Sequence, residues 1–145
     1  MSKEAARVIK QVEVNQLPNI VTKVTVNNLK EFTSCFDKIR DACPNTIIML
    51  LAEVGKTLFV SAHIPSSAEE KLTEWLADSV ENVINDGIVT EHTFGDTYIL
   101  EITYPEGSES SPFKLIDVVN GTAFSILRKL GLEQEDVSSE EIFEF

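Results

Sequence analysis

Apolar positions follow helical spacing in some segments of the chain and strand-like spacing in others. Spacings of three and four residues predict helices over residues 4–13, 28–43, 67–84 and 111–130. β-branched or nearly unbroken apolar runs predict strands over residues 20–26, 46–54, 57–64, 88–94 and 97–104. Residues 46–54 are apolar almost throughout, which is expected of a strand that is covered on both faces.

Polar residues and glycines mark where these elements begin and end. Asn28 followed by Glu31 has the pattern of a capping box, and so has Ser67 followed by Glu70. Glycine turns at residues 55–56 and 95–96 predict that the strands on either side form hairpins. The pair Asn120-Gly121 interrupts the last helical pattern, so a strand followed by a shorter helix is an alternative there.

The predicted order is (α)βαββαββα, which favours an α+β fold. We expect a mostly antiparallel sheet with the helices packed on one face. The length of 145 residues fits one domain. The expected organisation is a leading helical segment over residues 1–18, a single α+β domain over residues 19–132, and an acidic C-terminal tail over residues 133–145.

The net charge of −12 is unevenly distributed. Residues 1–40 carry seven basic and four acidic side chains, whereas residues 41–145 carry five basic and 20 acidic ones. The overall charge argues against strong nonspecific binding to nucleic acid, because phosphate contacts need a basic surface. If an anion is bound, the first strand and helix are the expected place, and the candidate residues are Lys23, Lys30, Lys38 and Arg40.

No recognisable catalytic or metal-binding pattern is present in the sequence, so a non-catalytic protein without cofactors is expected. There is no phosphate-binding glycine loop and no serine-nucleophile motif. Cys35 and Cys43 lack metal-binding spacing, and we expect them to be structural thiols. His63 and His92 fall in predicted strands without a nucleophile motif, and Trp75 lies at core spacing in a helix.

The last expectations concern the cellular compartment of the chain and its C-terminal tail. The longest apolar run, residues 46–52, is much shorter than the ~20 residues that span a bilayer, and the N-terminus has no secretory pattern, so a cytoplasmic chain without membrane contact is expected. The acidic tail contains three apolar side chains that would favour contact with a surface on this domain, on a second copy or on a partner. They are the candidate partner-binding residues Ile142, Phe143 and Phe145.

One family resemblance spans about two-thirds of the chain, most clearly residues 21–83. A strand leads into Leu29-Lys30-Glu31-Phe32, and a very apolar strand, Ile47-Ile48-Met49-Leu50-Leu51-Ala52, is followed by a returning strand, Leu58-Phe59-Val60-Ser61-Ala62. A helix after Pro65 and a closing helix that ends at Gly131-Leu132 complete the order. The pattern resembles the C-terminal (C-Ala) domain of alanyl-tRNA synthetases, which is related to the accessory domain of DHH-type phosphoesterases.

The resemblance implies a non-catalytic domain that helps to hold tRNA and to dimerise the enzyme. One feature departs from the family: its glycine-rich motif is replaced by Asn85-Asp86-Gly87 and the predicted hairpin, so no binding residue is carried over from that motif. This departure, the charge and the tail support an alternative, an acidic protein-interaction module on the same fold. A third alternative, a DHH-type hydrolase, would need an Asp/His metal cluster that two histidines in strands cannot supply.

Overall fold

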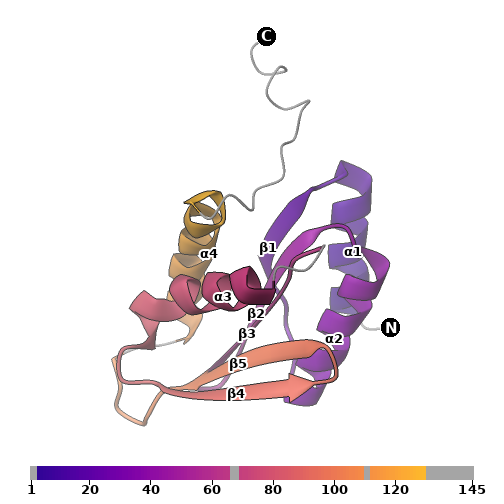
Figure 1. Ribbon diagram of the computed structural model, residues 1–145. Coiled ribbons are helices and arrows are strands. Elements are labelled where there is room, and N and C mark those ends of the chain that lie inside the picture. Colours follow the sequence, from indigo (N-terminus) through magenta and orange to yellow (C-terminus); the bar gives the residue numbers. More distant parts are fainter. Residues whose placement is uncertain (1–2, 66–68, 110–111, 130–145) are drawn as a thin grey trace.

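The computed structural model describes residues 3–65, 69–109 and 112–129 of the chain. The α+β class and the predicted order of elements are confirmed (Figure 1). The elements are α1 (Lys3–Asn15), β1 (Asn19–Lys23), α2 (Leu29–Ala42), β2 (Ile47–Val54), β3 (Thr57–His63), α3 (Glu69–Ile84), β4 (Ile88–Phe94), β5 (Thr97–Thr103) and α4 (Pro112–Lys129).

The five strands form one sheet in the order β1-β2-β3-β5-β4. β1 runs parallel to β2, because α2 connects them as a crossover. The other neighbouring pairs are antiparallel, and β2–β3 and β4–β5 are hairpins. β4 is therefore an edge strand of the sheet, at the opposite side from β1.

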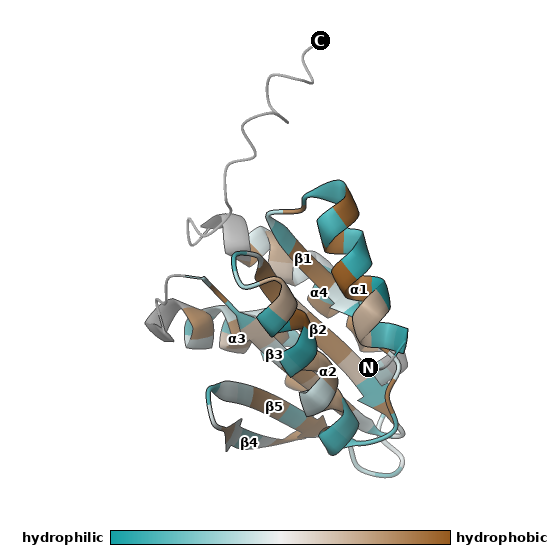
Figure 2. Cartoon of the chain, turned by 90° about the vertical axis from the view of Figure 1, so that its right-hand side faces the viewer, coloured by the Kyte–Doolittle hydropathy of each residue, from teal (hydrophilic) through white to brown (hydrophobic). Residues whose placement is uncertain are grey.

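The expectation that the helices lie on one face of the sheet was wrong, because they cover both faces. α1 and α2 pack on one face with Ile48 and Leu50 of β2, whereas α3 and α4 pack on the other face with Met49 and Leu51. Successive side chains of a strand point to opposite faces, so the unbroken apolar run of β2 needs a cover on each side. Figure 2 shows β2 as a largely hydrophobic strand behind α1 and α2.

The leading segment is part of the packed structure. Ala5, Val8 and Val12 of α1 are buried in the same core cluster as the apolar face of α2. Their spacing of three and four residues places them on one side of the helix. The Arg7 guanidinium donates to the backbone carbonyl of Lys23 at 2.9 Å, which also connects α1 to the end of β1.

The start of α2 confirms the predicted cap with one difference. Asn28 Oδ1 accepts a hydrogen bond from the Glu31 N–H at 2.8 Å. The returning contact is made by Glu31 Oε1 with the N–H of Asn27 at 3.0 Å, one residue before the cap. The other predicted capping box includes Ser67, which lies outside the described residues.

The C-terminal part of the domain is one helix, α4, so the alternative of a strand and a shorter helix is wrong. The helix continues through Asn120 and Gly121 because its apolar side faces α3 and the sheet. Trp75 of α3 is fully buried, and its indole N–H donates to the backbone carbonyl of Ala123 at 2.9 Å. Trp75 is therefore a core residue that joins the two helices, as its spacing predicted.

Candidate functional site

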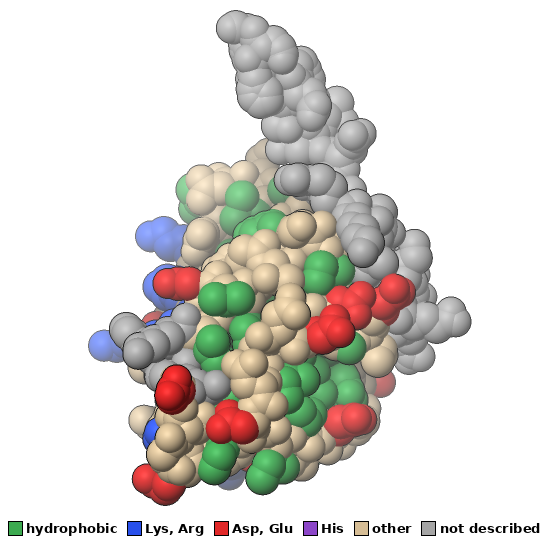
Figure 3. Space-filling model, turned by 90° about the vertical axis from the view of Figure 1, so that its left-hand side faces the viewer, with side chains coloured by type: hydrophobic (Ala, Val, Ile, Leu, Met, Phe, Trp, Pro, Cys, Tyr) green, Lys and Arg blue, Asp and Glu red, His purple; other side chains and the backbone are tan. Residues whose placement is uncertain are grey.

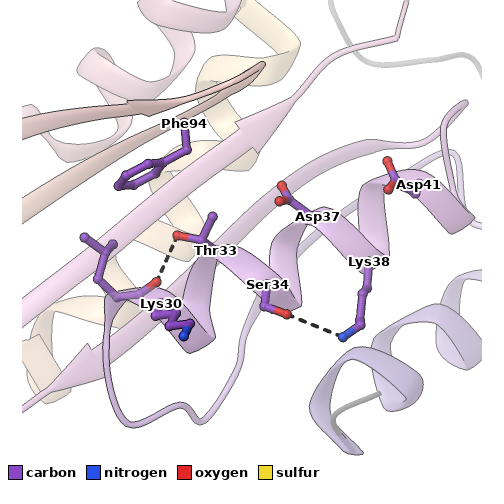
Figure 4. Close-up of a pocket in the computed structure, with 8 residues that line it drawn as sticks. Lys30, Thr33, Ser34, Asp37, Lys38, Asp41 and Phe94 are labelled. Carbon is purple, nitrogen blue, oxygen red and sulfur yellow. Dashed lines mark hydrogen bonds between the residues drawn. The ribbon is translucent and has the colours of Figure 1, made fainter.

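A groove of about 730 Å³ lies between the outer face of α2 and the end of β4. Figure 4 shows that α2 supplies one wall and that Phe94 of β4 points toward it. The groove is lined by Leu29, Lys30, Thr33, Ser34, Asp37, Lys38, Asp41 and Phe94. Two of the four predicted anion-binding residues, Lys30 and Lys38, therefore line the same surface.

The pattern of α2 explains why these side chains face the groove. Lys30, Ser34 and Lys38 are four residues apart, so they lie along one side of the helix, opposite the buried residues such as Phe32 and Phe36. The Lys38 ammonium lies 3.4 Å from Ser34 Oγ. Eight residues of helix rise about 12 Å, which sets the spacing of the two lysine Cα atoms along the axis.

Phe94 provides an aromatic surface at one end of the groove. Its side chain is 47% exposed, although it is a large apolar residue in a strand. The His92 ring is nearly parallel to it, with the ring centroids 5.8 Å apart, because the two residues are alternate members of β4. The pairing of His92 with Ile99 places both rings on the sheet face that α2 covers.

A charged network fixes the hairpin to α2 next to the groove. Arg40 Nη1 donates to Thr97 Oγ1 at 2.8 Å, and Thr97 Oγ1 donates to Asp37 Oδ1 at 2.6 Å. Arg40 also forms ion pairs with Asp37 at 3.3 Å and with Asp41 at 3.5 Å. The Arg40 guanidinium thus offsets the negative charge of the two groove carboxylates, Asp37 and Asp41. Within the part of the chain that the structure describes, neither Lys30 nor Lys38 forms an ion pair.

The other two predicted cationic residues are not part of the groove lining. Lys23 pairs with Glu53 at 3.1 Å, and its register opposite Leu51 places it on the sheet face of α3 and α4. Arg40 lies beside the groove but its guanidinium is used in the network with Thr97. Ile142, Phe143 and Phe145, the predicted partner-binding residues, lie outside the described residues.

The opposite face of the molecule is less suited to an anion. Figure 3 shows Asp and Glu side chains distributed over this face and Lys and Arg side chains at one margin. A second hollow of about 450 Å³ lies there between α3 and the tip of the β4–β5 hairpin. Its described lining contains Asp96 and no lysine or arginine. Burial and a hydrogen bond with Glu91 raise the pKa of the Tyr98 phenol beside it.

The histidines and cysteines occupy structural positions. His63 Nε2 lies 3.0 Å from the carbonyl of Pro44, and His92 Nε2 lies 2.6 Å from Glu101 Oε1. Cys35 and Cys43 are both buried thiols, as expected. Burial raises the pKa of the Cys43 thiol, and the charge of Glu13 raises it further. Among residues 3–65, 69–109 and 112–129, no group of three or more His, Cys, Asp or Glu side chains could hold a metal ion.

Sequence reasoning did not identify Phe94 as a site residue. It was recognised only as the end of a strand, because its exposure depends on β4 being at the sheet edge. The one local signal was its position directly before the turn at Gly95-Asp96, which puts an aromatic ring at a hairpin tip. An aromatic residue at a tip is less covered by neighbouring strands than one in the middle of a sheet.

Comparisons with known proteins give no family for this chain. No protein-family model matches it, and no curated protein matches its sequence. None of the described helices combines the length and the apolar character needed to cross a membrane. The chemistry of the site consists of two lysines without an ion pair to any described residue, a partly exposed aromatic ring, and two carboxylates whose charge Arg40 offsets.

Proposed function

We propose that this chain is a non-catalytic domain of the alanyl-tRNA synthetase C-terminal type, which contributes to tRNA binding through the groove between α2 and β4. The observation that carries the proposal is the placement of Lys30, Lys38 and Phe94 around one groove. The order of elements, which agrees with the pattern that suggested the family, gives further support.

The chemistry of the groove suits an unpaired stretch of RNA. A lysine ammonium binds phosphate as a point charge, and an exposed phenylalanine ring offers a surface on which a base can stack. Lys30 and Lys38 would meet phosphates along α2, and Phe94, with His92 beside it, would meet a base. A base can reach Phe94 only when it is not paired within a duplex, so a loop or an end of the tRNA is the expected contact.

The number of cations limits how strong this binding can be. Two phosphate contacts give a slope of about −1.4 for the logarithm of the association constant against the logarithm of the salt concentration. Such weak dependence is typical of an accessory contact that acts together with other parts of a larger enzyme. The net charge of −12 also lowers the affinity of the isolated domain.

A titration of labelled tRNA(Ala) with the chain at roughly 50 and 150 mM salt tests the proposal. We expect binding that weakens with salt and that falls by about tenfold or more in the double variant Lys30→Glu/Lys38→Glu, since two phosphate contacts become repulsions. Phe94→Ala should weaken binding by about 1–3 kcal/mol through the loss of stacking.

The matched control is Lys10→Glu/Lys56→Glu, which changes the net charge equally at exposed positions outside the groove lining. Its effect on tRNA affinity should be much smaller than that of the groove variant. Equal losses in both double variants would mean that only the overall charge matters. No complex with the unmodified chain at low salt would contradict the tRNA role.

A second candidate, an acidic protein-interaction module, is favoured by the exposure of β4. Ile88 is 66% exposed and Val89 40% exposed, although β-branched residues in a sheet are usually covered. As an edge strand, β4 also presents backbone groups that can pair with a strand of another chain. This second function is supported if the chain does not bind tRNA but forms a stoichiometric complex with a protein. Val89→Lys should then abolish that complex.

A further inference from the structure

We propose that the groove between α2 and β4 also binds the acidic tail, residues 133–145, of a second copy of this chain. The chain would then associate with itself through exchanged tails. The association follows from the groove and the tail alone. Its consequence for RNA binding rests on the tRNA role proposed above.

The groove side of this contact combines apolar and cationic groups. Phe94 and the partly buried Leu29 supply apolar surface at one end, and Lys30 and Lys38 supply positive charge along α2. In Figure 4 the Phe94 ring lies over the start of α2 near Thr33, and the Lys30 and Lys38 side chains project from the other side of the helix. An occupant of matching chemistry carries carboxylates with aromatic or aliphatic side chains between them.

The tail has this composition. Residues 133–145 contain six acidic side chains and no basic one. Glu141 and Glu144 are direct neighbours in the sequence of the three apolar residues Ile142, Phe143 and Phe145. The Glu141 and Glu144 carboxylates, three positions apart, can therefore meet Lys30 and Lys38 while a phenylalanine contacts Phe94. Aromatic pairs of this kind add about 0.5–1.5 kcal/mol beyond the area they bury.

The described surface around α3 fits the tail less well. The exposed or partly exposed side of α3 carries Glu74, Asp78 and Glu81, which would repel it. The hollow beside α3 contains Asp96 and no described cation. Charge complementarity thus favours the groove at α2 over the acidic face shown in Figure 3.

The position of α4 favours a tail from another molecule. α4 packs on β1 and β2 and on the face opposite α2, whereas the groove lies beside β4 at the other edge of the sheet. The 12 residues from 130 to 141 extend at most about 40 Å, and a compact domain of this length is roughly 40 Å across. A path around the sheet is longer than the straight distance, so the tail reaches a neighbouring molecule more readily than its own groove.

The exchange of tails between two molecules would oppose RNA binding. Tail carboxylates would occupy the positions near Lys30 and Lys38 that phosphates need, and a tail phenylalanine would cover Phe94. Self-association and tRNA binding would then exclude each other. The tail would favour release of the RNA as the concentration of the chain rises.

Sedimentation velocity of the full chain over a range of concentrations, without RNA, tests the contact. At roughly 0.15 M salt the Debye length is about 8 Å, so the repulsion between two acidic molecules is screened while close contacts remain. We expect a sedimentation coefficient that rises with concentration. The rise should be lost in Lys30→Glu/Lys38→Glu and in Phe143→Ala/Phe145→Ala, and kept in Lys10→Glu/Lys56→Glu.

A charge exchange makes the test specific for the pairing of groove and tail. Glu141→Lys/Glu144→Lys should abolish association alone, and combining it with Lys30→Glu/Lys38→Glu in one chain should restore it. A monomer at all concentrations, or association that survives in the groove variant, would overturn the proposal. If the tails associate as expected but tRNA does not bind, the tail contact stands and the tRNA role fails. If tRNA binds equally well with and without Glu141→Lys/Glu144→Lys, the competition is refuted.

Discussion

The two hairpins of the sheet are built alike but differ in how they are covered. Each turns at a glycine with positive φ, Gly55 at 60° and Gly95 at 62°, where residues with a side chain are strained. In β2 and β3 the side chains between the strand ends are nearly all buried. In β4 six of the seven residues are exposed, and the seventh, His92, is only partly buried.

The difference shows that local turn chemistry determines the hairpin, whereas its position in the sheet determines what the hairpin can do. The first hairpin is central, so helices cover both of its faces and it contributes to stability. The second has β5 next to β3, which leaves β4 at the edge with exposed side chains. The candidate groove lies beside this second hairpin, where Phe94 can contact another molecule without a change in the core.

The largest expected contrast between the hairpins is in the cost of removing an aliphatic side chain. Leu50 of β2 is fully buried, so Leu50→Ala should lower the free energy of unfolding by about 2–5 kcal/mol. Ile88 of β4 is 66% exposed, so Ile88→Ala should change it by less than about 1 kcal/mol. Denaturant unfolding of both variants measures the contrast, and similar losses would mean that β4 is covered in solution.

The sequence predicted the fold class and the order of elements because both depend on local periodicity. It did not predict the distribution of helices over the two faces, since that depends on which helix follows which strand in space. The unbroken apolar run around Leu50 did predict a strand that is covered on both faces. The same cover was not predicted for the rest of the sheet, so the helices were expected on one face. A helix was predicted for the segment that forms α4, and its packing against α3 rules out the alternative that the local signal at Asn120-Gly121 left open.

The candidate site was only partly accessible from the sequence. Lys30 and Lys38 share one helix face, so helical spacing brings them together. Lys23 is close to them in sequence but lies on the other face of the sheet, which only the strand register reveals. Phe94 joins the groove through the pairing of β4 with β5 and the approach of α2. Such a contact between segments more than 50 residues apart leaves no local pattern in the sequence.

A second expected effect concerns how the exposed hairpin is held at its base. A Cβ added at Gly87, just before β4, would lie 2.6 Å from Ile102 Cγ2 and 2.9 Å from both the Ile84 carbonyl oxygen and Tyr104 Cε1. Tyr104 is buried and its hydroxyl donates to the Val83 carbonyl at 2.6 Å, so it has little room to move. Gly87→Ala should therefore destabilise the protein by about 1–3 kcal/mol in denaturant unfolding.

Gly121→Ala is the matched control for this substitution. A Cβ at Gly121 meets no atom within 4 Å, and the residue lies inside α4. Alanine is the better helix former, so this change should stabilise the protein by about 0.5–1 kcal/mol. Opposite signs for the two glycine substitutions would show that β4 is exposed along its length but tightly packed where it begins. A loss at Gly121 equal to that at Gly87 would argue against the close packing of Gly87 on Ile102 and Tyr104.

The smallest contrast compares the threonines that follow the two turns, Thr57 and Thr97. The Thr97 hydroxyl is bonded to Arg40 and Asp37, whereas the Thr57 hydroxyl lies 3.1 Å from that of Thr103. Hydrogen bonds to charged groups contribute about 1.5–3 kcal/mol and neutral ones about 0.5–1.5 kcal/mol. Thr97→Val should therefore cost more stability than Thr57→Val when both are measured by thermal or denaturant unfolding.

The two valine variants also separate stability from binding. Thr97 is three residues from Phe94, and its bonds to α2 hold the hairpin tip beside the groove. Thr97→Val should therefore weaken tRNA binding several-fold under conditions where the domain remains folded, whereas Thr57→Val should leave the affinity unchanged. Equal affinities for both variants would show that the position of Phe94 relative to α2 does not matter for binding, and the role of the second hairpin in the groove would have to be given up.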